Sequence, residues 1–237
     1  MSRTSQAGFA RRRNRILAAD PLIPPQFGFT IVATYGPEKA ALMRAMSVKA
    51  GFILAAALAL SACLPDSINP LGDPKTAAPD PRLIGNWSGT MNDEPATLAV
   101  TAGEGAMLDF RVVTRDAEGK EEWVKLGGFP AALKNRTYIN VKFIEEADKV
   151  YDPNEQNFYV CRYVLSDDGT LTVWTMAEQP VVDAIAAGRI NGSVDGSDEN
   201  RTIHITDSNV VLADFLGTAD PDVLFSHKYA VFQRAAP

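Results

Sequence analysis

From Leu83 onward, short runs rich in β-branched and aromatic residues recur, separated by clusters of Gly, Asp and Asn. This pattern is typical of β-strands rather than of long amphipathic helices. The short links Asp116–Gly119 and Asp167–Gly169 predict tight hairpin turns. We therefore expect a mainly β domain, a single antiparallel barrel of about 8–9 strands in meander order. The expected strands are 83–90, 97–101, 107–114, 122–126, 138–144, 158–165, 171–176, 202–205 and 229–234.

Two segments interrupt the strand pattern and predict short helices. The segment 180–188 has Pro180 at its start and Gly188 at its end, with apolar residues along one face; this arrangement favours a helix. The segment 207–217 is expected to be a second helix, capped by Asp207 or Ser208. Both lie between late strands, so we expect them to plug or cover one end of the barrel.

Gly85-Asn86-Trp87 lies on the first expected strand and Arg234 on the last. At these positions the domain, residues 83–237, resembles a lipocalin-like barrel. The resemblance implies that Gly85 allows a bend, that Trp87 closes one end of the barrel and that Arg234 lies over Trp87. A guanidinium group on an indole ring contributes about 0.5–2 kcal/mol. The chain departs from lipocalins in the helix expected at 180–188 and in having no Thr-Asp-Tyr-like second signature.

A ten-residue apolar run, 51–60, is preceded by Arg44 and Lys49 and ends at Leu60-Ser61-Ala62-Cys63. The run is too short to span a bilayer and fits the apolar region of a signal peptide. Residues 43–62 resemble a bacterial lipoprotein signal peptide, which implies a diacylglyceryl thioether on Cys63, cleavage before it and acylation, for example with palmitate, of the new amino terminus. Leu64, rather than Asp, follows the cysteine, so the resemblance points to the periplasmic side of the outer membrane. The alternative is a buried helix that ends in cysteine.

Two further segments are assigned from composition. Residues 1–42 contain an arginine cluster and the prolines Pro21, Pro24 and Pro25 but no helical periodicity. We interpret them as a disordered, non-native upstream extension; a basic arm for nucleic acid is the alternative. Residues 63–82 contain five prolines and predict a semi-extended tether that lifts the domain off the membrane.

The charge of the chain limits its partners. After residue 49 there are 15 Lys and Arg residues and 27 Asp and Glu residues, a net charge of −12. Nucleic acid and anionic lipid headgroups would repel such a surface. We expect no nucleic-acid partner; acidity that simply keeps a surface soluble is the plainer interpretation.

The sequence has few candidates for catalytic chemistry. The two histidines, His204 and His227, have no acidic, Cys or His partner at a metal-binding spacing, and His204 is expected to face outward from a strand. Cys161 lies in a strand-like run and is expected to pack as a small apolar residue. The acidic segment 195–200 is interpreted as a solvated turn rather than a calcium loop. We predict no cofactor, no metal site and no enzymatic activity.

Two hypotheses for function remain, with an enzyme as a third. The first is an outer-membrane lipoprotein that binds a small apolar ligand or lipid inside the barrel, a hypothesis that rests on fold analogy. The second is an interaction module that docks an envelope protein or inhibits a periplasmic hydrolase, through an exposed apolar patch or a loop near 145–157. An enzyme would need His204, His227 or Cys161 to converge with carboxylates. The residues expected to line a ligand cavity are Leu108, Phe110, Val141, Phe143, Tyr159 and Trp174.

Overall fold

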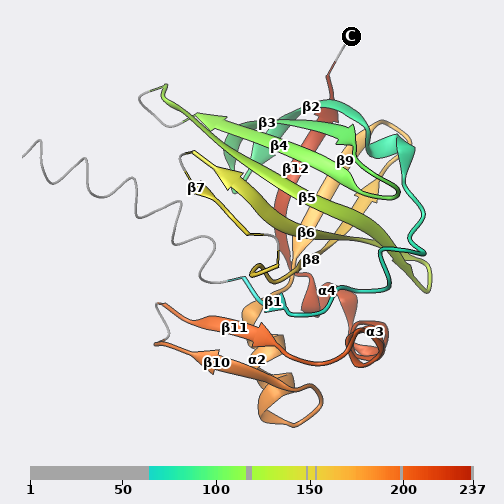
Figure 1. Cartoon of the computed structure of the whole chain (residues 1–237), viewed down its shortest axis with the longest axis vertical. Helices are drawn as coiled ribbons and strands as arrows, with labels where there is room; N and C mark the ends of the chain where they lie inside the picture. Colours follow the sequence, from blue (N-terminus) through green and yellow to red (C-terminus); the bar gives the residue numbers. More distant parts are fainter. Residues whose placement is uncertain (1–63, 116–118, 148, 153, 198–199, 236–237) are drawn as a thin grey trace, which may run out of the picture. The chain divides into compact units, whose positions relative to one another are not determined.

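The computed structural model describes residues 64–115, 119–147, 149–152, 154–197 and 200–235. Eight antiparallel strands close into a barrel (Figure 1), because the last strand pairs with the first and each other strand pairs with its neighbour. The expected lipocalin-like antiparallel barrel is therefore confirmed. Its strands are β2 (Gly85–Met91), β3 (Glu94–Ala102), β4 (Leu108–Arg115), β5 (Glu121–Leu133), β6 (Arg136–Glu146), β8 (Tyr159–Leu165), β9 (Thr170–Thr175) and β12 (His227–Arg234). A short strand, β7 (Lys149–Val150), pairs with the end of β6.

The strands form where apolar residues alternate with polar ones. On β4, for example, Leu108, Phe110 and Val112 are buried while the residues between them are more exposed. This two-residue period places one side chain in every pair inside the barrel. The buried residues of that interior are Leu83, Trp87, Ala96, Leu98, Val100, Leu108, Phe110, Val112, Ile139, Cys161, Tyr163, Leu171, Ala230 and Phe232.

The two ends of the barrel differ, and we name them after a residue at each. The Trp87 end holds the start of β2, the β3–β4 turn and the β8–β9 turn. The Tyr159 end holds the β2–β3 turn, the end of β6 and the start of β8. The chain crosses between the ends once per strand, as expected for antiparallel neighbours joined by short links.

Residues 176–226 are inserted between β9 and β12, and the described part of this insertion contains three helices and two strands. The helices predicted at 180–188 and 207–217 are present as α2 (Glu178–Ala186) and α3 (Asn209–Thr218), and α3 is capped by Ser208. A third helix, α4 (Pro221–Leu224), was not predicted. The insertion builds a second core with Tyr138 and Val160, which lie on the outside of the barrel wall. The helices therefore pack on the wall and do not cover a barrel end, contrary to the prediction.

The strand predicted at 202–205 is present as β11 (Thr202–Ile205), but it is not part of the barrel. It is the central strand of a separate three-stranded sheet, between β10 (Gly192–Asp195) and β1 (Asp66–Ser67). The sequence pattern identified the strand correctly because Ile203 and Ile205 alternate with polar residues. Local periodicity does not say which sheet a strand joins.

The segment expected to be a tether is packed onto the domain at its start. β1 runs parallel to β11, and Ser67 also exchanges two backbone hydrogen bonds of 2.8 and 2.7 Å with Phe158. Leu71 is buried in the second core. Residues 72–76 are exposed, and the short helix η1 (Pro81–Leu83) then leads into β2. The prolines correctly exclude a long helix, but long-range backbone pairing orders this segment.

Residues 1–63 lie outside the described part of the chain, and with them the expected upstream extension, the signal peptide and Cys63. Among the residues that the structure describes, no helix has the length and apolar character needed to cross a membrane.

Candidate functional site

At the Trp87 end of the barrel, Trp87 of the Gly-x-Trp motif contacts Arg234 of the last strand. Trp87 is buried, and its indole Nε1 donates a 2.9 Å hydrogen bond to the Leu83 carbonyl. The Arg234 guanidinium lies 4.2 Å from the Trp87 ring centroid, and Nη1 donates to the Ile84 carbonyl at 2.9 Å. Gly85 has φ +138°, and a Cβ there would lie 2.6 Å from Arg234 Nη1. The expected contact between Arg234 and Trp87 is therefore present.

The interior positions predicted to line a ligand cavity are packed against other side chains. Leu108 is 1% exposed and Phe110 8% exposed, and both belong to the barrel core. Val141 packs against the same core. Large side chains from other strands, including Tyr163 and Phe232, share this space. Around these residues the barrel is filled by its own side chains.

Two more of the predicted lining residues belong to a small aromatic group at the Tyr159 end. Phe143 lies between Tyr159 and Tyr151, with ring centroids 5.5 and 5.6 Å away. Tyr151 donates a 2.8 Å hydrogen bond to Glu146 Oε2. Burial and this carboxylate raise the pKa of Tyr151 to about 12. The group Phe143, Tyr151 and Tyr159 is called the aromatic group below.

Trp174 does not face the barrel interior, contrary to the prediction. Its neighbour Val173 packs against the barrel core, whereas Trp174 packs against the second core outside the wall. Arg162, its partner on β8, lies 5.2 Å from the Trp174 ring centroid and forms an ion pair with Asp222. Along β9, Val173 is the residue that faces the interior, and Trp174, one residue later, faces outward because successive side chains of a strand point to opposite faces.

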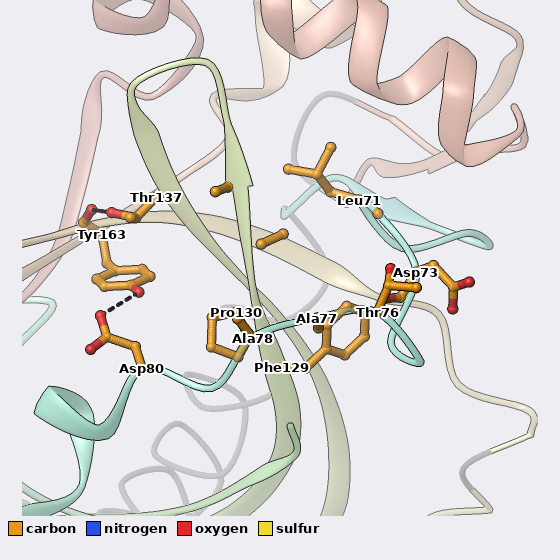
Figure 2. A pocket seen from close by; sticks show the side chains of 13 residues that line it. Leu71, Asp73, Thr76, Ala77, Ala78, Asp80, Phe129, Pro130, Thr137 and Tyr163 are labelled. Atoms are coloured by element: carbon orange, nitrogen blue, oxygen red, sulfur yellow. Dashed lines mark hydrogen bonds between the residues drawn. The ribbon is translucent and has the colours of Figure 1, made fainter. Parts of the chain in front are cut away.

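A hollow of about 400 Å³ lies between the 71–80 segment and strands β5, β6 and β8 (Figure 2). At one side of it the Tyr163 hydroxyl donates a 3.0 Å hydrogen bond to Asp80 Oδ2. Hydrogen bonds from Arg82 hold the pKa of Asp80 below its usual value, and burial raises that of Tyr163. Five of the other lining residues are small and apolar: Ala77, Ala78, Pro130, Ala131 and Ala132. The sequence does not predict this hollow, because the proline-rich residues 63–82 are typical of a tether that does not pack on the domain.

A buried carboxylate, Asp66, pairs with His204 across β1 and β11. Asp66 is 7% exposed, and its Oδ1 lies 2.8 Å from His204 Nδ1. Asn157 Nδ2 donates to the same oxygen at 2.9 Å. Burial raises the pKa of Asp66, and the contacts with His204 oppose that shift. We expected His204 to have no acidic partner near it in sequence; the partner is 138 residues away.

The other candidates for catalysis lie elsewhere. His227 Nδ1 is 3.2 Å from the Thr175 hydroxyl at the start of β12. Cys161 is buried in the barrel core, and burial raises the pKa of its thiol to about 12. His204 lies on β11, in the three-stranded sheet outside the barrel. These three residues therefore belong to three different parts of the domain.

Within the described residues, no group of three or more His, Cys, Asp or Glu side chains is arranged to hold a metal ion. The acidic segment 195–200 includes two residues outside the described part of the chain. The loop expected near 145–157 is partly ordered as β7, where Val150 is 74% exposed.

The outer face of β3, β4 and β5 carries a tryptophan flanked by an arginine. Trp123 is half-buried, and Arg111 lies 4.7 Å from its ring centroid. Val113 is the cross-strand partner of Trp123 on the same face. Helices α2 and α3 belong to the second core, which contacts β5 only at its opposite end, around Ala131 and Leu133. We call Arg111, Val113 and Trp123 the Trp123 surface.

Searches against protein-family models, curated proteins and solved structures found no match to this chain.

Proposed function

We propose that this protein is a lipid-anchored protein of the bacterial outer membrane whose barrel domain binds another envelope protein through its outer surface. The anchor rests on the lipobox-like sequence Leu60–Cys63. The mode of action rests on one observation, the filled interior around Leu108 and Phe110. A carrier of apolar ligands needs an interior pocket, typically of several hundred Å³.

The energetics of the interior also favour a structural role for it. Burying one large apolar side chain stabilises a protein by about 1.5–3 kcal/mol. A ligand inside the barrel would have to displace such side chains and replace their packing. The interior is therefore better suited to holding the barrel shape than to exchanging a ligand.

The Trp123 surface is our candidate for the docking site. Tryptophan and arginine are enriched among residues that contribute most to protein–protein binding. The indole of Trp123 is held by Arg111 from the neighbouring strand, so little side-chain entropy is lost on binding. The net charge of −12 after residue 49 favours a neutral or basic partner.

Photocrosslinking in the native host tests this proposal. A photoreactive residue replacing Val113 should give one dominant crosslinked protein, and Trp123→Ala should reduce that product at least fivefold. The matched control is the same photoreactive residue at Thr101, on the outer face of β3 towards the Trp87 end. Equal products at both positions, or no effect of Trp123→Ala, would contradict docking at this surface.

A second candidate function is favoured by the hollow beside Asp80. Its volume of about 400 Å³ lies within the range of small-molecule sites, and its lining is largely apolar. Native mass spectrometry of protein purified from its host would detect a retained small molecule. Ala78→Trp should abolish that retention if the hollow is the site, whereas a mass equal to the acylated polypeptide alone favours the docking proposal.

A further inference from the structure

The folded domain begins almost directly after Cys63. Pro65, Asp66 and Ser67 are buried. Ser67 exchanges two backbone hydrogen bonds with Phe158, and the next residue, Ile68, donates its backbone N–H to the Ile205 carbonyl of β11. A fully extended chain spans about 3.3–3.6 Å per residue. A lipid on Cys63 would therefore be held within roughly 7 Å of the buried backbone at Pro65, which leaves no free tether.

The chain enters the fold at the Tyr159 end of the barrel. Phe158, which pairs with Ser67, and Asn157, which binds Asp66, directly precede β8 at that end. Burial raises the pKa of the Tyr159 hydroxyl, and the nearby Asp66 carboxylate adds to that shift. The anchor point and the Tyr159 end therefore belong to one side of the molecule.

The side chains at this end suit the headgroup layer of a bilayer. The aromatic group lies there, Lys149 Nζ lies 4.2 Å from the Tyr151 ring centroid, and Val150 is strongly exposed. Tyrosine and lysine have apolar bodies with polar tips and are favoured at membrane–water interfaces. Asp152 and Glu155 lie in the same region, so neutral rather than anionic headgroups fit this surface.

We infer that the Tyr159 end of the barrel rests on the bilayer, with Lys149, Val150 and Tyr151 at the level of neutral lipid headgroups. The inference rests on the proposed acylation of Cys63. It assigns a membrane-contact surface to the folded domain itself and turns the Trp87 end away from the membrane.

Depth-dependent quenching of a fluorescent label tests this orientation. The full acylated chain is labelled at Glu155→Cys or at Glu104→Cys, an exposed glutamate in the β3–β4 turn at the Trp87 end. Both variants replace the same residue type, and Cys161 stays buried and unlabelled. In phosphatidylcholine vesicles with a quencher on the lipid headgroup, we expect at least threefold stronger quenching at position 155.

A second variant separates the effect of the short anchor from local label effects. Ten Gly and Ser residues inserted between Cys63 and Leu64 add a flexible reach of about 17 Å. This insertion should lower the quenching at position 155 towards that at position 104. An acylated chain with equal quenching at both positions would overturn the orientation alone. An unmodified Cys63 with no binding to vesicles would overturn the lipoprotein proposal and the orientation with it, and intact mass measurement distinguishes the two results.

Discussion

Asn140 shows how one side chain can order a polar segment. Its Oδ1 accepts a 2.7 Å hydrogen bond from the Leu71 amide, and its Nδ2 donates a 3.1 Å bond to the Leu71 carbonyl. Asn140 is completely buried. The amide thus imitates the paired bonds of a neighbouring strand and fixes Leu71 to the outside of β6.

Replacing Asn140 should be costly for this reason. Asn140→Ala removes both bonds and leaves the backbone groups of Leu71 without their partner, so we expect a loss of about 2–4 kcal/mol in the free energy of unfolding. Urea denaturation measures this loss. Asn135→Ala, at an exposed turn, is the control and should stay within about 0.5 kcal/mol of the wild type. A similar effect from both variants would contradict the role of Asn140.

Asp80 predicts a pH dependence of stability. Its pKa is lowered in the folded protein, mainly by hydrogen bonds from Arg82. The unfolded chain therefore takes up a proton at Asp80 first as the pH falls. The carboxylate's contribution is present above the ordinary pKa of 3.8 and is lost as the pH falls through the lowered value.

We expect Asp80→Asn to be about 1 kcal/mol less stable than the wild type at pH 7, because Arg82 is largely exposed and solvent screens the pair. The difference should shrink towards zero at pH 2–3. Denaturant unfolding of both proteins at a series of pH values tests this expectation; a difference that grows on acidification would contradict it.

Cys161 should be chemically silent in the folded protein. Burial raises the pKa of its thiol to about 12, so the thiolate that reacts with disulfide reagents is scarce at pH 8. In a Cys63→Ser variant we expect no measurable reaction of Cys161 with an aromatic disulfide over an hour at pH 8. In 8 M urea the reaction should be complete within minutes. Rapid reaction in buffer would show that the barrel opens at β8.

At the scale of elements, the two-residue strand β1 (Asp66–Ser67) connects the small sheet to the barrel. It pairs with β11 on one side and with Phe158, next to β8, on the other. Ser67 donates its backbone N–H to the Phe158 carbonyl, while the chain pairs with β11 on its other side. Ser67→Pro removes this donor and should cost at least 3 kcal/mol. Ser67→Ala keeps the backbone bonds and should cost less than about 1.5 kcal/mol. Urea denaturation compares the two, and equal losses would contradict the role of β1.

The elements also show how far the sequence predicts this fold. The barrel strands follow from alternation, as on β4, and α2 and α3 follow from Pro180, Gly188 and Ser208. The Gly-x-Trp motif locates the contact between Trp87 and Arg234. Alternation and helix-end residues are signals within short stretches of sequence. The contact between Trp87 and Arg234 is distant in sequence, but the Gly-x-Trp motif predicts it.

What the sequence does not predict depends on contacts between distant residues. The pairing of β1 with β11, the contact between Asp66 and His204, and the hollow beside Asp80 all need a segment rich in Pro and Asp to dock on the wall. Such composition normally indicates a linker. Trp174 was placed on the wrong face because a one-residue shift reverses every side chain of a strand.

On the scale of the whole molecule, the barrel core and the second core share structural elements. β6 contributes Ile139 to the first core and Tyr138 to the second. β8 does the same with Cys161 and Val160. A wall with both faces buried couples the two cores, so neither is expected to melt alone.

We therefore expect one cooperative thermal transition for residues 64–235. Near-ultraviolet circular dichroism, which reports the packed aromatic residues, and far-ultraviolet circular dichroism should give the same midpoint within about 1 °C. Tyr138→Ala should lower both midpoints together. Separate transitions, or a shift in only one signal, would contradict this coupling.

Because β1 pairs with β11, β1 cannot complete its sheet until β11 has been synthesised. Asp66 and His204 are 138 residues apart, so the first strand of the domain waits for its partner until nearly the whole chain exists. At about 5–20 residues per second this takes on the order of ten seconds. During that interval Pro65, Asp66 and Ser67 are accessible to proteases, chaperones and modifying enzymes. In the folded domain the same residues are buried.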